Sequence, residues 1–135
     1  MDAEIKRLVR QRAQDACEYC GLTESWAAPF NLQIEHILPR KHHGGDQIEN
    51  LALACSDCNL HKGPNIAGID PLSMRMTELF HPRRHKWDEH FRLHLGMIIG
   101  KTDIGRTTVD VLDMNAEERV KLRIIIELFR QSRQT

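Results

Sequence analysis

The sequence predicts an α+β fold: a small core of two short strands and one helix, flanked by an N-terminal and a C-terminal helix. Three observations predict it. Two Cys-x2-Cys pairs lie within residues 17–63, apolar residues recur at helical spacing in residues 2–16 and after residue 115, and two strand-like stretches separate the cysteine pairs. With 135 residues and no long linker, the chain is expected to form a single domain, 1–135, whose extension covers residues 64–135.

Composition excludes several classes of protein. A charged fraction of 28% and a hydrophobic fraction of 41% are typical of a folded globular chain. Nineteen basic residues balance nineteen acidic ones, which excludes a uniformly basic nucleic-acid binder but leaves room for a local basic groove. No apolar run approaches the roughly 18 residues of a membrane helix, and the charged start does not resemble a secretory signal. We therefore expect no membrane association and a cytoplasmic protein.

The core elements follow in order from local patterns. Residues 2–16 form the expected N-terminal helix, which leads into the first cysteine pair. Residues 32–37 and 50–54 are expected strands, joined by a loop that contains a Gly-Gly turn. A short helix is expected to begin near Ser56 and to end at Gly63, because glycine commonly follows the last turn of a helix.

The extension is less regular. Its aromatic and apolar spacing predicts a helix around residues 83–95. Residues 97–100 and 107–111 are expected to pair as a small hairpin with a glycine in the turn. Asn115 with Glu118 three residues later fits a capping box at the start of the C-terminal helix.

The cysteines predict a structural zinc site. All four belong to Cys-x2-Cys pairs, and each pair is short enough to direct two sulfurs at one ion. A reducing compartment disfavours disulfides. The alternative is four buried thiols that act as small hydrophobic residues. The expected ligands are Cys17, Cys20, Cys55 and Cys58.

The segment between the cysteine pairs resembles the HNH endonuclease motif. Glu35 directly precedes His36, Asn50 follows His36 by fourteen positions, and Asn59 follows Asn50 by nine. The resemblance covers residues 17–63 and implies a ββα-metal core of treble-clef-like type with structural zinc. It also implies metal-dependent hydrolysis of DNA phosphodiester bonds.

The resemblance assigns a role to each motif residue. His36 is the expected general base, and imidazole suits this role because it titrates near neutral pH. Asn50 is expected to brace the loop behind it. Glu35 and Asn59 are expected to hold Mg²⁺ or Mn²⁺ through oxygen atoms, with His61 as an alternative to Asn59. Neighbours on a regular strand point to opposite faces, so a site shared by Glu35 and His36 requires a distorted strand end.

The expected partner is DNA, most simply double-stranded DNA. A basic stretch in the extension would contact phosphates without reading sequence, although part of it could equally be an ordinary solvated helix face. A homodimer or a specificity partner would decide between nicking and double-strand cleavage. The alternatives to a nuclease are a catalytically silent zinc-stabilised DNA-binding module and a zinc scaffold for protein partners. The candidate phosphate contacts are Arg40, Lys41, Lys62, Arg83, Arg84 and Lys86.

Overall fold

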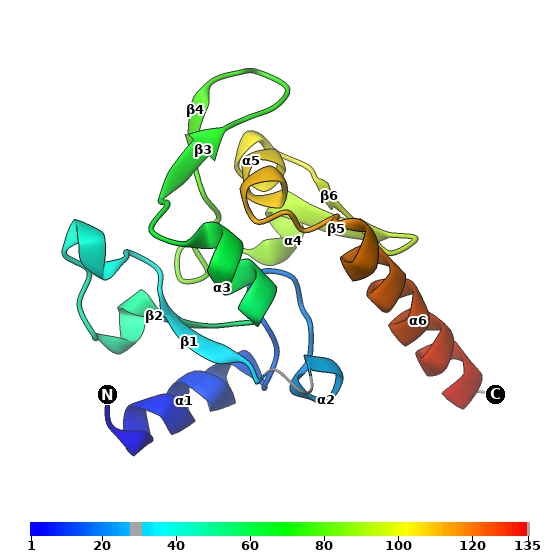
Figure 1. The fold of residues 1–135 in the computed structure, drawn as a ribbon, viewed down its shortest axis with the longest axis horizontal. Helices are drawn as coiled ribbons and strands as arrows, with labels where there is room; N and C mark the ends of the chain where they lie inside the picture. Colours follow the sequence, from blue (N-terminus) through cyan, green and yellow to red (C-terminus); the bar gives the residue numbers. More distant parts are fainter. Residues whose placement is uncertain (28–30, 135) are drawn as a thin grey trace.

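The structure is a computed structural model that describes residues 1–27 and 31–134 (Figure 1). Within these residues the strands form three antiparallel two-stranded sheets, β1–β2, β3–β4 and β5–β6. The elements in chain order are α1 (Ala3–Ala13), α2 (Glu24–Ala27), β1 (Gln33–His36), η1 (Arg40–His42), η2 (Ile48–Asn50), β2 (Leu51–Ala54), α3 (Ser56–Lys62), β3 (Ala67–Ile69), β4 (Met76–Glu78), α4 (Trp87–His90), β5 (Phe91–His94), β6 (Met97–Gly100), α5 (Asp103–Val111) and α6 (Glu117–Arg133).

The predicted core of two strands and one helix is confirmed. β1 and β2 pair in register from Gln33 opposite Ala54 to His36 opposite Leu51. α3 lies against β1, and α1 lies against β2. All four residues of β2 are buried, so this strand forms the centre of the core. α3 ends at Lys62 and Gly63 caps it, in agreement with the glycine stop signal.

The predicted N-terminal helix is also confirmed, with a shorter extent. Asp2 caps α1 by accepting a hydrogen bond from the Ile5 backbone N–H at 2.9 Å. The helix ends at Ala13 because Gln14 adopts a left-handed conformation (φ 55°), which turns the chain toward the first cysteine pair.

The extension differs from its prediction in two places. The helix expected over 83–95 is reduced to the single turn of α4, after which residues 91–94 form β5. The expected hairpin is wrong, because β6 pairs with β5 and residues 107–111 belong to α5. Thr102 caps α5, and the Thr108 hydroxyl donates to the Ile104 carbonyl at 2.7 Å, so the polar group of this β-branched residue is satisfied within the helix.

A projecting hairpin, β3–β4, was not predicted (Figure 1). Its turn is held by Asp70, whose buried carboxylate accepts two hydrogen bonds from Arg106 of α5 at 3.0 and 2.8 Å. The Leu72 N–H and the Ser73 hydroxyl also donate to Asp70. The hairpin is therefore anchored to the body at its turn.

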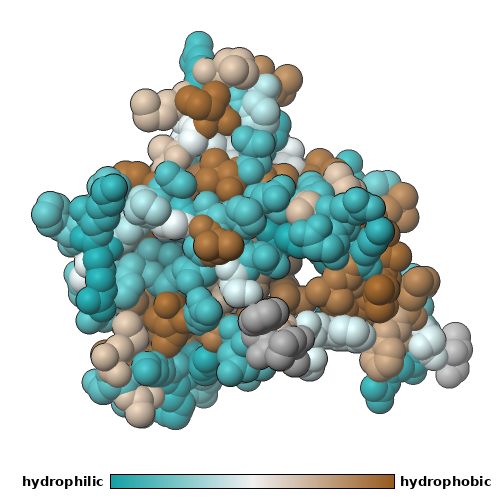
Figure 2. Space-filling model, in the orientation of Figure 1, coloured by the Kyte–Doolittle hydropathy of each residue, from teal (hydrophilic) through white to brown (hydrophobic). Residues whose placement is uncertain are grey.

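The C-terminal helix is confirmed as α6, but Asn115 does not cap it. Its side chain bonds instead to both backbone groups of Ile98, and Ala116 occupies the cap position. Apolar side chains gather on the surface around α6 (Figure 2). No helix among the described residues is both long and apolar enough to span a membrane.

Candidate active site and metal centre

The four cysteines meet at one point. Cys17 and Cys20 come from the turn after α1, and Cys55 and Cys58 come from the start of α3. Their sulfur atoms all lie within 4.8 Å of one another. A tetrahedral zinc ion with Zn–S bonds of about 2.3 Å separates its sulfurs by about 3.8 Å, so this cluster fits structural zinc.

Hydrogen bonds support the sulfurs as metal ligands. The Cys20 N–H points at Cys17 Sγ at 3.5 Å, and the Cys58 N–H points at Cys55 Sγ at 3.4 Å. Burial raises the pKa of Cys17, whereas hydrogen bonds from the other three cysteines, first from Cys17, hold the pKa of Cys20 well below its ordinary value. A thiolate, the form that binds zinc, is therefore favoured at this position.

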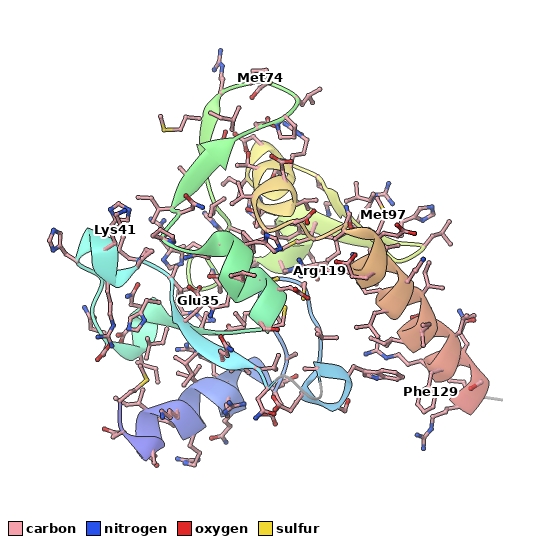
Figure 3. The ribbon with its side chains drawn as sticks, viewed as in Figure 1. Glu35, Lys41, Met74, Met97, Arg119 and Phe129 are labelled. Carbon is pink, nitrogen blue, oxygen red and sulfur yellow. The ribbon has the colours of Figure 1, made fainter. Side chains whose placement is uncertain are left out.

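Arg119 reaches the same cluster from α6 (Figure 3). Its guanidinium lies 2.9 Å from Cys58 Sγ and 3.9 Å from Cys55 Sγ, and the residue is buried. Burial alone would lower the pKa of Arg119, but the Cys58 and Cys20 sulfurs raise it above its ordinary value. The extension thus places a permanent positive charge against the cysteine cluster.

Glu35 points from β1 into the interior (Figure 3). Its Oε1 accepts a hydrogen bond from the Tyr19 hydroxyl, and its Oε2 pairs with Lys62 Nζ at 3.2 Å. The side chain is only 4% exposed. Burial raises the pKa of Glu35 above its ordinary value, while Lys62 and Tyr19 oppose that rise. Both carboxylate oxygens are therefore occupied within the protein.

The expected divalent-ion site does not fit this arrangement. Asn59 donates to Gln33 at 2.6 Å and has no recorded bond to Glu35. β1 keeps regular pairing through His36, so the distorted strand end that a shared site requires is not observed. His61 is exposed at the end of α3.

His36 lies on the other side of the same strand and faces the loop. Its Nε2 is 2.7 Å from Asp46 Oδ1, and its side chain is 16% exposed. Arg40 bonds to the same oxygen at 3.1 Å. The bond from His36 holds the pKa of Asp46 below its ordinary value. Asp46 was missed because the sequence was interpreted there only as a turn; an acidic residue directly after Gly-Gly was the available signal.

Asn50 holds the loop that carries these groups. Its amide donates to the Leu38 carbonyl at 3.0 Å and to the Gly45 carbonyl at 2.9 Å, and its oxygen accepts from the Leu38 N–H at 2.8 Å. The two arms of the loop approach closely: a Cβ on Gly44 would lie 1.7 Å from the Leu38 carbonyl oxygen. A single side chain thus spans the loop, in the position expected of a brace.

The predicted phosphate contacts divide into two groups. Lys62 is buried and bonds to Glu35 and to the His36 and Ile37 carbonyls, so the expectation that it contacts phosphate conflicts with its position. Arg83 is mostly buried and pairs with Glu18. The remaining four are exposed, with Lys41 in the middle of η1 (Figure 3): Arg40, Lys41, Arg84 and Lys86.

A groove of about 700 Å³ lies beside the loop. Leu38 and Asn50 line it, together with Ile66, which precedes β3, and Met76, the first residue of β4. Arg84 also lines it, although this residue pairs with Glu78 at 3.3 Å. Arg84 and Asn50, the residue that braces the loop, therefore lie along the same groove.

Comparisons with known proteins agree with this geometry. Residues 17–65 match the HNH endonuclease family. The chain is 25% identical to the Septu protein PtuB of Bacillus thuringiensis over 118 residues, which are 86% of this chain and 43% of that relative. The chain therefore spans less than half the length of this relative. No solved structure matches. The segment that matches the HNH endonuclease family contains the two paired strands, α3 and all four cysteines.

Proposed function

We propose that this protein is an endonuclease that hydrolyses DNA phosphodiester bonds with His36 as the general base. One observation carries the proposal: inside an HNH domain, the imidazole of His36 lies at the end of β1, partly exposed, on a loop braced by Asn50. A histidine imidazole within reach of substrate is a common general base in hydrolysis.

The proposed reaction is a direct hydrolysis. A water molecule gives a proton to the His36 imidazole while its oxygen forms a bond to phosphorus. The bond between phosphorus and the 3′ oxygen breaks, and that oxygen takes up a proton from a solvent water molecule. The products carry a 5′-phosphate and a 3′-hydroxyl. Positively charged side chains beside the site stabilise the negative charge that develops on the phosphate in the transition state.

Mg²⁺ or Mn²⁺ is the cation that the resemblance implies for the phosphate. Because Tyr19 and Lys62 occupy both oxygens of Glu35, we assign no step to a divalent ion held by Glu35 and Asn59. The requirement for a divalent ion is therefore part of the test below.

The proposed substrate is duplex DNA. Arg40 and Lys41 extend from the loop next to His36, while Arg84 and Lys86 lie in the extension. Cations of this kind bind the backbone without reading sequence. A homodimer or a specificity partner, which we also propose, would supply sequence choice and a second active site.

The decisive test is relaxation of supercoiled plasmid by wild-type protein and by His36→Ala, each with Mg²⁺, with Mn²⁺ and with EDTA. The rate should fall about 10²–10⁴-fold in His36→Ala, as for the loss of a general base. His94→Ala, which removes an exposed histidine of β5, is the matched control and should keep the wild-type rate. Equal rates for wild-type and His36→Ala would refute the proposal.

A catalytically silent DNA-binding module is the second candidate. The closed Glu35–Lys62 pair favours it, because that pair leaves the expected metal ligand unavailable. DNA binding by the wild-type protein, with no cleavage under any of the three conditions, would establish this alternative.

A further inference from the structure

Asp46 and His36 form a pair whose geometry specifies the protonation of the imidazole. Asp46 Oδ1 lies 2.7 Å from His36 Nε2, within hydrogen-bonding distance. Ionised carboxylates only accept hydrogen bonds, so Nε2 must carry the hydrogen. In a neutral imidazole the lone pair is then on Nδ1.

Both partners of this hydrogen bond are held from behind. Asn50 bonds to the carbonyl of Gly45, the residue directly before Asp46. His36 is held by strand pairing opposite Leu51, and its carbonyl accepts from Lys62 Nζ at 3.4 Å. The contact thus joins two restrained segments, which is the condition for an orientation that is set before substrate binds.

Asp46 also carries the negative charge that is needed to orient an imidazole through its N–H. Arg40 bonds to its Oδ1 at 3.1 Å, and the bond from His36 lowers its pKa, so the carboxylate stays ionised. An ionised carboxylate beside an imidazole stabilises the imidazolium that forms when the base accepts a proton. Asp46 therefore favours both the correct starting tautomer and the product of proton transfer.

We propose that Asp46 is a positioning residue that fixes His36 as the Nε2–H tautomer and leaves Nδ1 as the atom that accepts the proton from water. The inference rests on the proposed function of His36. It separates the two acidic residues near the base: Asp46 orients His36, whereas Glu35 is bonded to Lys62 inside the core.

The test compares Asp46→Asn, Asp46→Ala and Asp46→Glu with wild-type protein in the plasmid assay. Asparagine can donate its amide hydrogen to Nε2 and so favour the opposite tautomer; the rate should fall at least about tenfold. Alanine admits water, which accepts or donates, so its rate should lie above that of asparagine. Glutamate should recover part of the activity. Glu49→Gln, an exposed carboxylate in the same loop, is the control and should leave the rate unchanged.

The tautomer itself is measured by the ring ¹⁵N chemical shifts of His36 at neutral pH in full-length protein, assigned by their absence in His36→Ala. Wild-type protein should show the hydrogen on Nε2, and Asp46→Asn should show it on Nδ1. An unchanged tautomer in Asp46→Asn, or a wild-type cleavage rate in that variant, would overturn the inference. If wild-type protein cleaves no DNA, the proposed function fails, while the ¹⁵N shifts still decide the role of Asp46.

Discussion

Two clusters on opposite sides of β1 differ in almost every physical property. The interior cluster contains Glu35, Lys62 and the four cysteines, and it is largely buried. The loop cluster contains His36, Arg40, Asp46 and Asn50, and it is partly exposed. Glu35 and His36 are consecutive residues, yet each belongs to a different cluster.

The comparison teaches that neighbouring residues of one motif can divide stability and chemistry between them. In the interior cluster every charge has a protein partner, and Tyr19, between two cysteines, bonds to Glu35 and so joins the zinc site to the strand. In the loop cluster the imidazole has one side-chain partner, Asp46, and lies near solvent. Substitutions in the first cluster should therefore affect folding, and those in the second should affect DNA cleavage or binding.

The largest effect is expected from Cys58→Ser. Zinc binding by four cysteines contributes about 10–16 kcal/mol in small zinc domains, so this variant should lose both zinc and the folded core. Elemental analysis should find about one zinc per wild-type chain, and circular dichroism should show unfolding of the variant. Ser56→Ala, which removes no sulfur, is the control. Well-folded wild-type protein without zinc would contradict this prediction.

Lys62→Met should follow in size. It leaves the Glu35 carboxylate buried without its cation, which costs about 3–5 kcal/mol in free energy of unfolding. Urea unfolding measures the loss. Lys121→Met, an exposed lysine of α6, should change stability by less than about 0.5 kcal/mol.

A double variant tests whether the unpaired charge of Glu35 causes the loss of stability. Adding Glu35→Gln to Lys62→Met removes the unpaired charge, so most of the lost stability should return. A double variant as unstable as Lys62→Met would show that the pairing of charges is not the reason.

The pH dependence of stability should separate the clusters further. Because burial raises the folded-state pKa of Glu35 above its ordinary value of 4.5, its carboxyl favours folding most below that pH. This contribution is lost as pH rises through the raised pKa. The stability of wild-type protein relative to Glu35→Gln should therefore decrease with rising pH in this window, as measured by urea unfolding. Both proteins bind zinc, so the contribution of zinc to stability cancels when the two are compared. A stability difference that does not change with pH would contradict the raised pKa of Glu35.

The smallest effect is expected from Lys41→Ala in the loop. Removing one phosphate contact should weaken DNA binding for all sequences and reduce the slope of log K against log salt by about 0.9. Fluorescence anisotropy at several salt concentrations measures the slope. Arg92→Ala, an exposed cation of β5, is the matched control. If both variants reduce the slope equally, the loop is not a preferred contact.

The core was predictable because its signals are local. The cysteine pairs, the two strand-like stretches and the glycine after α3 each describe a few adjacent residues, and the structure contains all of them. Prediction failed where a distant partner decides the outcome. Thr107 and Thr108 suggest a strand, but Thr108 bonds within α5 and to the Phe80 N–H, 28 residues away.

The candidate site shows the same limit. His36 and Asn50 lie in one braced loop region, as the spacing suggested. The burial of Lys62 depends on Glu35, 27 residues earlier, and the pairing of Arg83 depends on Glu18, 65 residues earlier. A sequence pattern identifies a cation but does not show which carboxylate already holds it.

The contact between Arg119 and Cys58 has a consequence for the order of events during protein synthesis. The two residues are 61 positions apart, so at about 5–20 residues per second the ribosome adds the arginine roughly 3–12 seconds after the last cysteine. Zinc held by four thiolates carries excess negative charge, and until Arg119 is made that charge lacks its neighbour from α6. A nascent chain released before Arg119 should bind zinc more weakly than the finished protein, so zinc retention would report whether translation has reached the C-terminal helix.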